Sequence, residues 1–80
     1  MYVVYILKCG DGTLYTGITT DIAARIAQHR AGTGAKYTRG RGPFTLLYTE
    51  RHPDRGSATK REQQIKRQGK AYKLQLIQGE

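Results

Sequence analysis

The residues YVVYILK at Tyr2–Lys8 and LYTGIT at Leu14–Thr19 decide the fold of this chain. Both segments are rich in β-branched and aromatic side chains, which favour strands. The turn-forming segment Cys9–Gly12 separates them, so the pair predicts a β-hairpin with a longer loop. A third segment of the same character, Phe44–Glu50, follows Pro43 and predicts a third strand.

Helices are expected after the hairpin and after the third strand. Thr20 or Asp21 can cap a first helix that continues through Arg30 and ends at Gly32. The following segment, Gly32–Gly42, is rich in glycine and cations and predicts a flexible loop with one helical turn.

Two more helices complete the predicted fold. Ser57 is expected to cap a helix that ends near Gln68, and Lys70–Gln78 predicts another. The order ββαβαα indicates an α+β fold, a small three-stranded antiparallel sheet flanked by helices. Strand alternation and helical spacing predict most of the core, namely Val4, Ile6, Ile18, Ile22, Ile26, Leu46, Ile65 and Leu74.

The length and composition indicate one small cytoplasmic domain. At 80 residues we expect a single domain over 1–80. The longest strongly apolar run, Val3–Leu7, is far shorter than the roughly 20 residues that span a bilayer, and no signal peptide pattern precedes it. The single cysteine, Cys9, has no partner for an internal disulfide.

The charge distribution points to a polyanionic partner. The chain has 14 Lys+Arg against 6 Asp+Glu, a formal net charge of +8. Between Ile22 and Thr49 there is no acid, and from Arg55 to Gly79 the only acid is Glu62. We therefore expect nucleic acid as the partner. A membrane is not expected, because the basic segments lack an apolar helical face before Tyr72.

Two helical faces carry candidate functional side chains. Arg25 and His29 are four residues apart on the first helix and share one face. Glu62 lies within an apolar stripe of the second helix, on the face expected to turn inward. An inward carboxylate needs an ion pair, hydrogen bonds or a metal ion. The residues alone leave open a boundary-packing role for Arg25 and a structural salt bridge for Glu62.

These residues resemble the GIY-YIG nucleases across nearly the whole chain. Val3-Val4-Tyr5 and Tyr15-Thr16-Gly17 are relaxed forms of the two tripeptides that name the family. Arg25, His29 and Glu62 follow in the family's order. The segments GAKYTR at Gly34–Arg39 and KREQQIK at Lys60–Lys66 are similar to those of a small stand-alone subfamily of uncharacterised bacterial proteins.

The resemblance implies phosphodiester hydrolysis with one divalent ion, Mg²⁺ or Mn²⁺, held by Glu62. The implied catalytic residues are Tyr5, Tyr15, Arg25, His29 and Glu62. Arg25 suits the charge that develops on the phosphoryl oxygens. Either Tyr15 or His29 can serve as the base, and a relay from Tyr15 to His29 stays open. The residues expected to bind nucleic acid are Lys36, Tyr37, Arg39, Arg41, Lys60 and Lys66.

The chain departs from the family at one position. Many members carry a site asparagine after the glutamate, whereas this chain has no asparagine, and Gln75 is the nearest substitute. Our leading hypothesis is a metal-dependent endonuclease acting on DNA, with a protein partner that could supply specificity. The alternative is a non-catalytic nucleic-acid-binding module, and a weaker third reading is a binder of RNA or anionic membranes.

Overall fold

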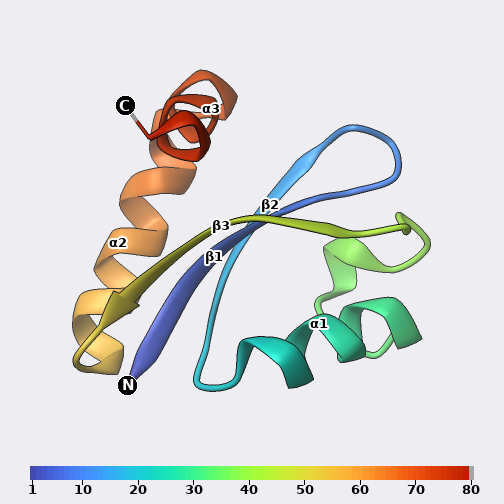
Figure 1. Ribbon diagram of the computed structural model, residues 1–80, viewed down its shortest axis with the longest axis horizontal. Helices are drawn as coiled ribbons and strands as arrows, with labels where there is room; N and C mark the ends of the chain where they lie inside the picture. Colours follow the sequence, from blue (N-terminus) through green and yellow to red (C-terminus); the bar gives the residue numbers. More distant parts are fainter. Residues whose placement is uncertain (80) are drawn as a thin grey trace.

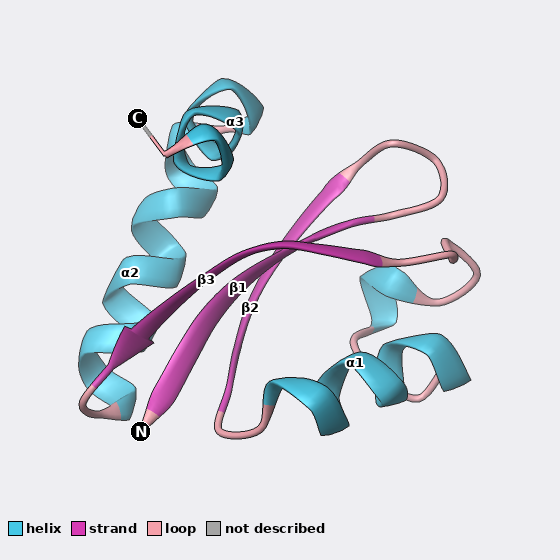
Figure 2. Cartoon of the chain, in the orientation of Figure 1, coloured by secondary structure: helices cyan, strands magenta, loops and turns pink. Residues whose placement is uncertain are grey.

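The computed structural model describes residues 1–79 and contains a three-stranded sheet with helices on both faces (Figures 1 and 2). The elements in chain order are β1 (Tyr2–Lys8), β2 (Leu14–Thr19), α1 (Ile22–Ala31), the 3-10 helix η1 (Lys36–Thr38), β3 (Thr45–His52), α2 (Arg55–Gln68) and α3 (Lys70–Gln78). The predicted α+β fold and the order ββαβαα are confirmed. No helix within residues 1–79 is long and apolar enough to cross a membrane.

The sheet has the order β2-β1-β3, with both pairs antiparallel. The central position of β1 agrees with its composition, because only a strand covered on both faces can bury four consecutive residues, Val4–Leu7. In the β1–β2 register Tyr5 lies opposite Gly17 and Leu7 opposite Tyr15. Tyr5 and Tyr15 therefore lie on the same face of the sheet, near its β2 edge.

The core lies in two layers, one on each face of the sheet. On one face, Val4 and Ile6 pack with Ala58 and Ile65 of α2, and α3 adds further apolar side chains. On the other face Tyr5 and Leu7 pack with Cys9 and Phe44, and Ile22 and Ile26 of α1 cover them. Figure 1 shows α1 on one side of the strands, and α2 and α3 on the other.

Aspartates cap the N-termini of α1 and α2. The Asp21 carboxylate accepts a hydrogen bond from the Ala24 N–H at 3.1 Å, which selects Asp21 over Thr20 as the cap of α1. The expected Ser57 cap is wrong. Asp54 caps α2 by accepting from the Ser57 N–H at 2.8 Å, so the cap lies earlier in the chain than expected and the helix begins at Arg55.

Two of the residues predicted for the core are exposed. Leu46 is 38% exposed on the edge strand β3, next to a register irregularity opposite Ile6 and Leu7. Leu74 is 41% exposed, because α3 packs through Tyr72, Leu76 and Ile77 instead. Alternation and helical spacing give the face of an element but not which part of that face a neighbour covers. Strand β3 also extends to His52, beyond the predicted Glu50.

Candidate active site

Three rings from three elements form a cluster under α1. Tyr5 comes from β1, Tyr15 from β2 and His29 from the last turn of α1. The ring centroids lie 6.3 Å apart for the two tyrosines, 5.9 Å for Tyr5 and His29, and 5.5 Å for Tyr15 and His29. The imidazole meets both tyrosines edge to face, an arrangement that aromatic rings favour. The hairpin register and one helix thus bring together three of the predicted catalytic residues.

Gly17 makes room for the Tyr5 side chain. A Cβ atom at Gly17 would lie 2.6 Å from the Tyr5 hydroxyl oxygen, closer than real Cβ contacts. Gly17 pairs directly with Tyr5 across the β1–β2 ladder. The absence of a side chain at this position therefore lets the Tyr5 side chain cross the edge strand toward His29. This close approach explains why the third residue of the second tripeptide is glycine.

Both ring nitrogens of His29 are hydrogen-bonded. His29 is 1% exposed, with Nε2 2.9 Å from the Tyr5 hydroxyl and Nδ1 2.8 Å from the Thr38 hydroxyl. Thr38 donates its own hydrogen to the Ala35 carbonyl at 2.8 Å. Because that hydrogen is used, Thr38 accepts from His29 Nδ1–H, which leaves Nε2 of the neutral imidazole to accept from the Tyr5 O–H.

The loop around η1 is shaped to hold the imidazole. A Cβ atom at Gly34 would lie 2.5 Å from His29 Nδ1, so the glycine lets the loop close over the ring. Burial lowers the pKa of His29, and the nearby charge of Arg25 lowers it further. The imidazole therefore stays neutral at pH 7 and keeps its capacity to accept a proton.

The charges of Arg25 and Glu62 both act on the two tyrosines. Burial raises the pKa of Tyr5, while Arg25 opposes the shift and Glu62 adds to it. The pKa of Tyr15 is likewise raised by burial, with the same opposing contributions of Arg25 and Glu62. Both phenols are therefore protonated at neutral pH. The Arg25 Nη1 donates to Gln28 at 2.9 Å.

Glu62 stands where α2 packs against the edge strand β2. Its side chain is 18% exposed, and the Lys66 Nζ lies 3.6 Å from its carboxylate, an i,i+4 pair. An ion pair of this length is weak, so the Glu62 carboxylate oxygens can still bind another ligand. The neighbouring Arg61 instead pairs with Glu50, at 2.9 Å.

A divalent ion fits this site only as a largely hydrated ion. Residues 1–79 contain no cluster of three His, Cys, Asp or Glu side chains. Glu62 would thus be the one carboxylate ligand, with water and phosphate oxygens completing the coordination shell. Mg²⁺ accepts such a shell, because it retains water and needs few protein oxygens.

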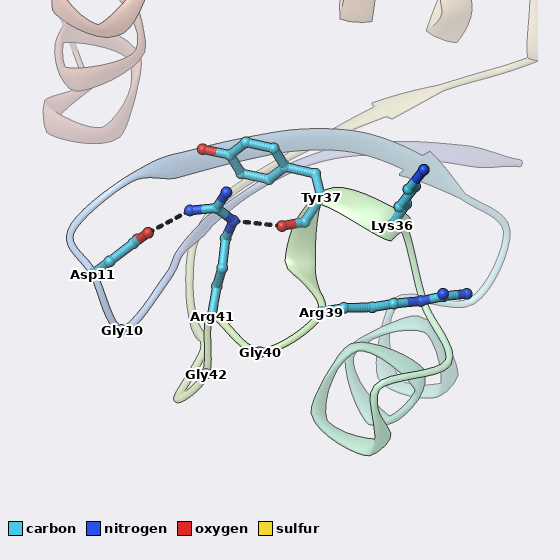
Figure 3. A pocket seen from close by; sticks show the side chains of 8 residues that line it. All are labelled: Gly10, Asp11, Lys36, Tyr37, Arg39, Gly40, Arg41 and Gly42. Carbon is cyan, nitrogen blue, oxygen red and sulfur yellow. Dashed lines mark hydrogen bonds and ion pairs between the residues drawn. The ribbon is translucent and has the colours of Figure 1, made fainter.

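Most residues predicted to bind nucleic acid line one surface pocket of about 680 Å³ (Figure 3). Tyr37 and Arg41 lie on the side of the hairpin loop, whereas the Lys36 and Arg39 side chains extend away from it (Figure 3). The Arg41 guanidinium lies 4.4 Å from the centre of the Tyr37 ring, and its Nη1 donates to Asp11 at 2.6 Å. On its other side the Tyr37 ring stacks on Tyr15, with centroids 5.8 Å apart. The pocket is thereby joined to the cluster of Tyr5, Tyr15 and His29.

The two lysines of α2 are placed differently. Lys66 Nζ lies 5.8 Å from the centre of the Tyr15 ring, so it belongs to the site. Lys60 is exposed, and its position two residues from Glu62 puts it on the far side of the helix. Gln75 is also exposed, whereas Lys73 lines a pocket with Tyr15. Thr38 and Lys73 carry no distinctive pattern in the sequence, so only the structure reveals them.

The fold and site define a GIY-YIG domain, and comparison with known families agrees. The model of the GIY-YIG catalytic domain matches residues 1–75. The chain therefore belongs to the GIY-YIG family, a family of nucleases, as the resemblance predicts.

Within that family the chain is similar to uncharacterised UPF0213 proteins. It is 53% identical to one from Streptococcus sanguinis, over 91% of this chain and 84% of that protein. It is 52% identical to one from Halobacterium salinarum, over 96% and 100% respectively. The solution NMR structure of the UPF0213 protein BH0048 from Bacillus halodurans matches 98% of this chain and 84% of that chain, with a TM-score of 0.62 and 48% identity.

Proposed function

We propose that this protein is a metal-dependent endonuclease that hydrolyses phosphodiester bonds of DNA. The observation that carries the proposal is the convergence of Tyr5, Tyr15, Arg25, His29 and Glu62 from four elements at the β2 edge of the sheet. A binding surface alone needs no mostly buried carboxylate near two phenols, and the carboxylate repels phosphate unless a cation lies between them.

The chain's own residues divide the work between charge and proton transfer. Arg25 binds the non-bridging oxygens of the scissile phosphate, whose charge grows in the transition state. When bound at Glu62, the divalent ion polarises the phosphate and stabilises the leaving oxygen. Tyr15 is partly exposed and orients the phosphate or the attacking water at the mouth of the cluster.

His29 is the final proton acceptor in this proposal. Its neutral Nε2 already accepts the hydrogen of the Tyr5 hydroxyl. Tyr5 and His29 are buried, so the proton of the attacking water enters through the partly exposed Tyr15. Tyr15 takes that proton as it passes its own to Tyr5, and Tyr5 passes its own to Nε2, so both tyrosines end neutral and His29 ends charged. The raised pKa of Tyr5 favours such a concerted exchange over a free phenolate.

Cleavage assays with matched variants test the proposal. We expect nicked, branched, duplex or single-stranded DNA to be cut with Mg²⁺ or Mn²⁺ and not with EDTA. Glu62→Ala should abolish the cut while metal-free DNA binding stays the same or tightens, because a negative charge has gone. Arg25→Ala should slow cleavage about 10²-fold and weaken binding less.

Melting curves separate catalysis from a structural role. If Glu62 is mainly half of an ion pair with Lys66, Glu62→Ala should lower the melting temperature and leave activity proportional to folded protein. A wild-type protein that binds DNA but cuts no substrate with any ion would instead support the non-catalytic binding module. Arg51→Ala, an exposed change on β3 at the opposite edge of the sheet, is the charge control.

A further inference from the structure

A second pocket lies against the candidate active site and has no role so far. Its volume is about 330 Å³, and it is lined by Leu14, Tyr15, Thr16, Tyr37, Lys66 and Lys73. Tyr15 joins it to the catalytic cluster, and Tyr37 joins it to the pocket of Lys36, Arg39 and Arg41. The second pocket therefore lies between the site of cleavage and the basic loop.

Two lysine side chains line this pocket, and only Lys66 has a carboxylate beside it, in a long ion pair. The nearest acid to Lys66 is Glu62, at 3.6 Å, and Lys73 Nζ donates to the Leu14 carbonyl at 3.3 Å. Burial lowers the pKa of Lys73, and repulsion from Lys66 lowers it further. An anion between the two lysines would relieve that repulsion and replace the water lost by burial.

A buried hydroxyl in the same pocket lacks a partner. Thr16 is 1% exposed, and among residues 1–79 its Oγ1 is the buried side-chain polar atom that makes no hydrogen bond. An unpaired buried hydroxyl costs free energy, so native proteins rarely keep one without a use. Because Oγ1 is itself covered, a ligand reaches it when the lining side chains shift, as the flexible lysine stems allow.

We propose that Lys66, Lys73 and Thr16 form a subsite for a second phosphate, the phosphodiester adjacent to the scissile one. The lysines neutralise its charge and the Thr16 hydroxyl donates to one of its oxygens. This proposal rests on the proposed function, because the pocket shares Tyr15 with the candidate active site. The strand then continues past Tyr37 toward the basic loop.

Metal-free binding tests the subsite without requiring cleavage. DNA affinity is measured in EDTA over a range of salt concentrations for Lys66→Gln, Lys73→Gln and the control Arg51→Gln. Each pocket variant should reduce the slope of log K against log[salt] by about 0.9, the value for one lost phosphate contact. The control should change the slope less.

Thr16→Val removes the hydroxyl and keeps the shape. It should weaken DNA binding about tenfold, the effect of losing one hydrogen bond to a charged group, while leaving the melting temperature unchanged or higher. Lysine variants that match Arg51→Gln, or Thr16→Val protein that binds as the wild type does, would overturn the subsite. If these variants bind DNA more weakly but the wild-type protein never cuts DNA, the phosphate subsite is supported and the proposed nuclease activity is rejected.

Discussion

At the scale of single residues, the candidate chemistry depends on space left by glycine. Gly17 and Gly34 lie where a side chain would collide with the Tyr5 hydroxyl and the His29 ring. Neither has the positive φ that often explains a glycine, so close approach is the reason for both. The hydrogen-bonded pair of Tyr5 and His29 is thereby sealed between β2 and the η1 loop.

Gly17→Ala should disturb that pair. Tyr5 is fully buried and has no room to move away from a Cβ atom 2.6 Å from its hydroxyl. We expect a loss of about 1–3 kcal/mol in the free energy of unfolding and at least tenfold slower cleavage. Gly56→Ala, in the first turn of α2 with its nearest contact at 3.4 Å, is the control and should leave stability equal or higher. Equal behaviour of the two variants in melts and assays would contradict this account.

Thr38 should hold the tautomer of His29. Thr38→Val removes the acceptor for Nδ1–H in a buried place, so stability should fall by about 1–3 kcal/mol and the Nε2–H tautomer should appear. Thr38→Ser keeps the hydroxyl and should retain the Nδ1–H form. The ¹⁵N chemical shifts of the imidazole report the tautomer directly, and a wild-type protein with Nε2–H would rule out the inferred direction of the Tyr5 hydrogen bond.

The lowered pKa of His29 also predicts how stability varies with pH. The unfolded chain takes up the proton near the usual value of about 6.5, before the folded protein does. The free energy of unfolding should therefore fall as pH drops below about 6.5. Above that pH the neutral His29 contributes its full stabilisation. Melting curves between pH 5 and 7.5 measure this, and His29→Gln should show a shallower decline because its side chain does not titrate.

At the scale of elements, the position of Glu62 depends on where α2 begins. The helix starts after Asp54, whose carboxylate accepts a hydrogen bond from the Ser57 N–H. With this start, the face that contains Ala58, Glu62 and Ile65 turns toward the sheet. The neighbouring ion pair of Arg61 and Glu50 joins the same helix to β3. The metal-binding candidate thus sits on an element fixed at several points.

Asp54→Ala should destabilise the protein by about 1 kcal/mol, the usual cost of losing an N-cap. Ser57→Ala is the control, because the Ser57 hydroxyl makes only a 3.3 Å bond to the Asp54 carbonyl. Chemical denaturation of both variants measures the difference. A larger loss in Ser57→Ala would favour Ser57 as the capping side chain.

At the scale of the whole molecule, charge and topology act together. The net charge of +8 is spread over helices and loops, but the fold gathers Lys36, Arg39, Arg41 and Lys66 around pockets that meet at Tyr37. The Asp11 carboxylate partly neutralises this surface by pairing with Arg41. Hydrogen bonds from Thr13 first, and then from Arg41, lower the pKa of Asp11 to about 2. The basic surface and the candidate active site therefore lie side by side.

Affinity for duplex DNA should therefore fall steeply with salt. When these cations neutralise phosphates, the DNA releases its bound counterions. In a plot of log K against log[salt], each phosphate contact then contributes a slope of about −0.9. Binding measured in EDTA across a salt series supplies that slope. A flat dependence would mean that the positive charge is only a solvated surface.

The sequence by itself determined the three strands, the three helices, their order and the family. These features depend on local preferences: β-branched and aromatic composition in Tyr2–Lys8 and Leu14–Thr19, helical spacing, and glycines at helix ends. Such preferences act over a few residues and can be read without knowing the rest of the chain. The five candidate catalytic residues could be predicted because the resemblance places them on those elements in order.

Only the tertiary structure decided which surfaces are covered and which side chains meet. Leu46 and Leu74 fit the apolar pattern but lie where no neighbouring element covers them. Thr38 reaches His29 across the loop that follows α1, and Thr16 and Lys73, far apart in the chain, line one pocket. Such contacts depend on how helices and loops pack across the sheet, and no local periodicity encodes that packing.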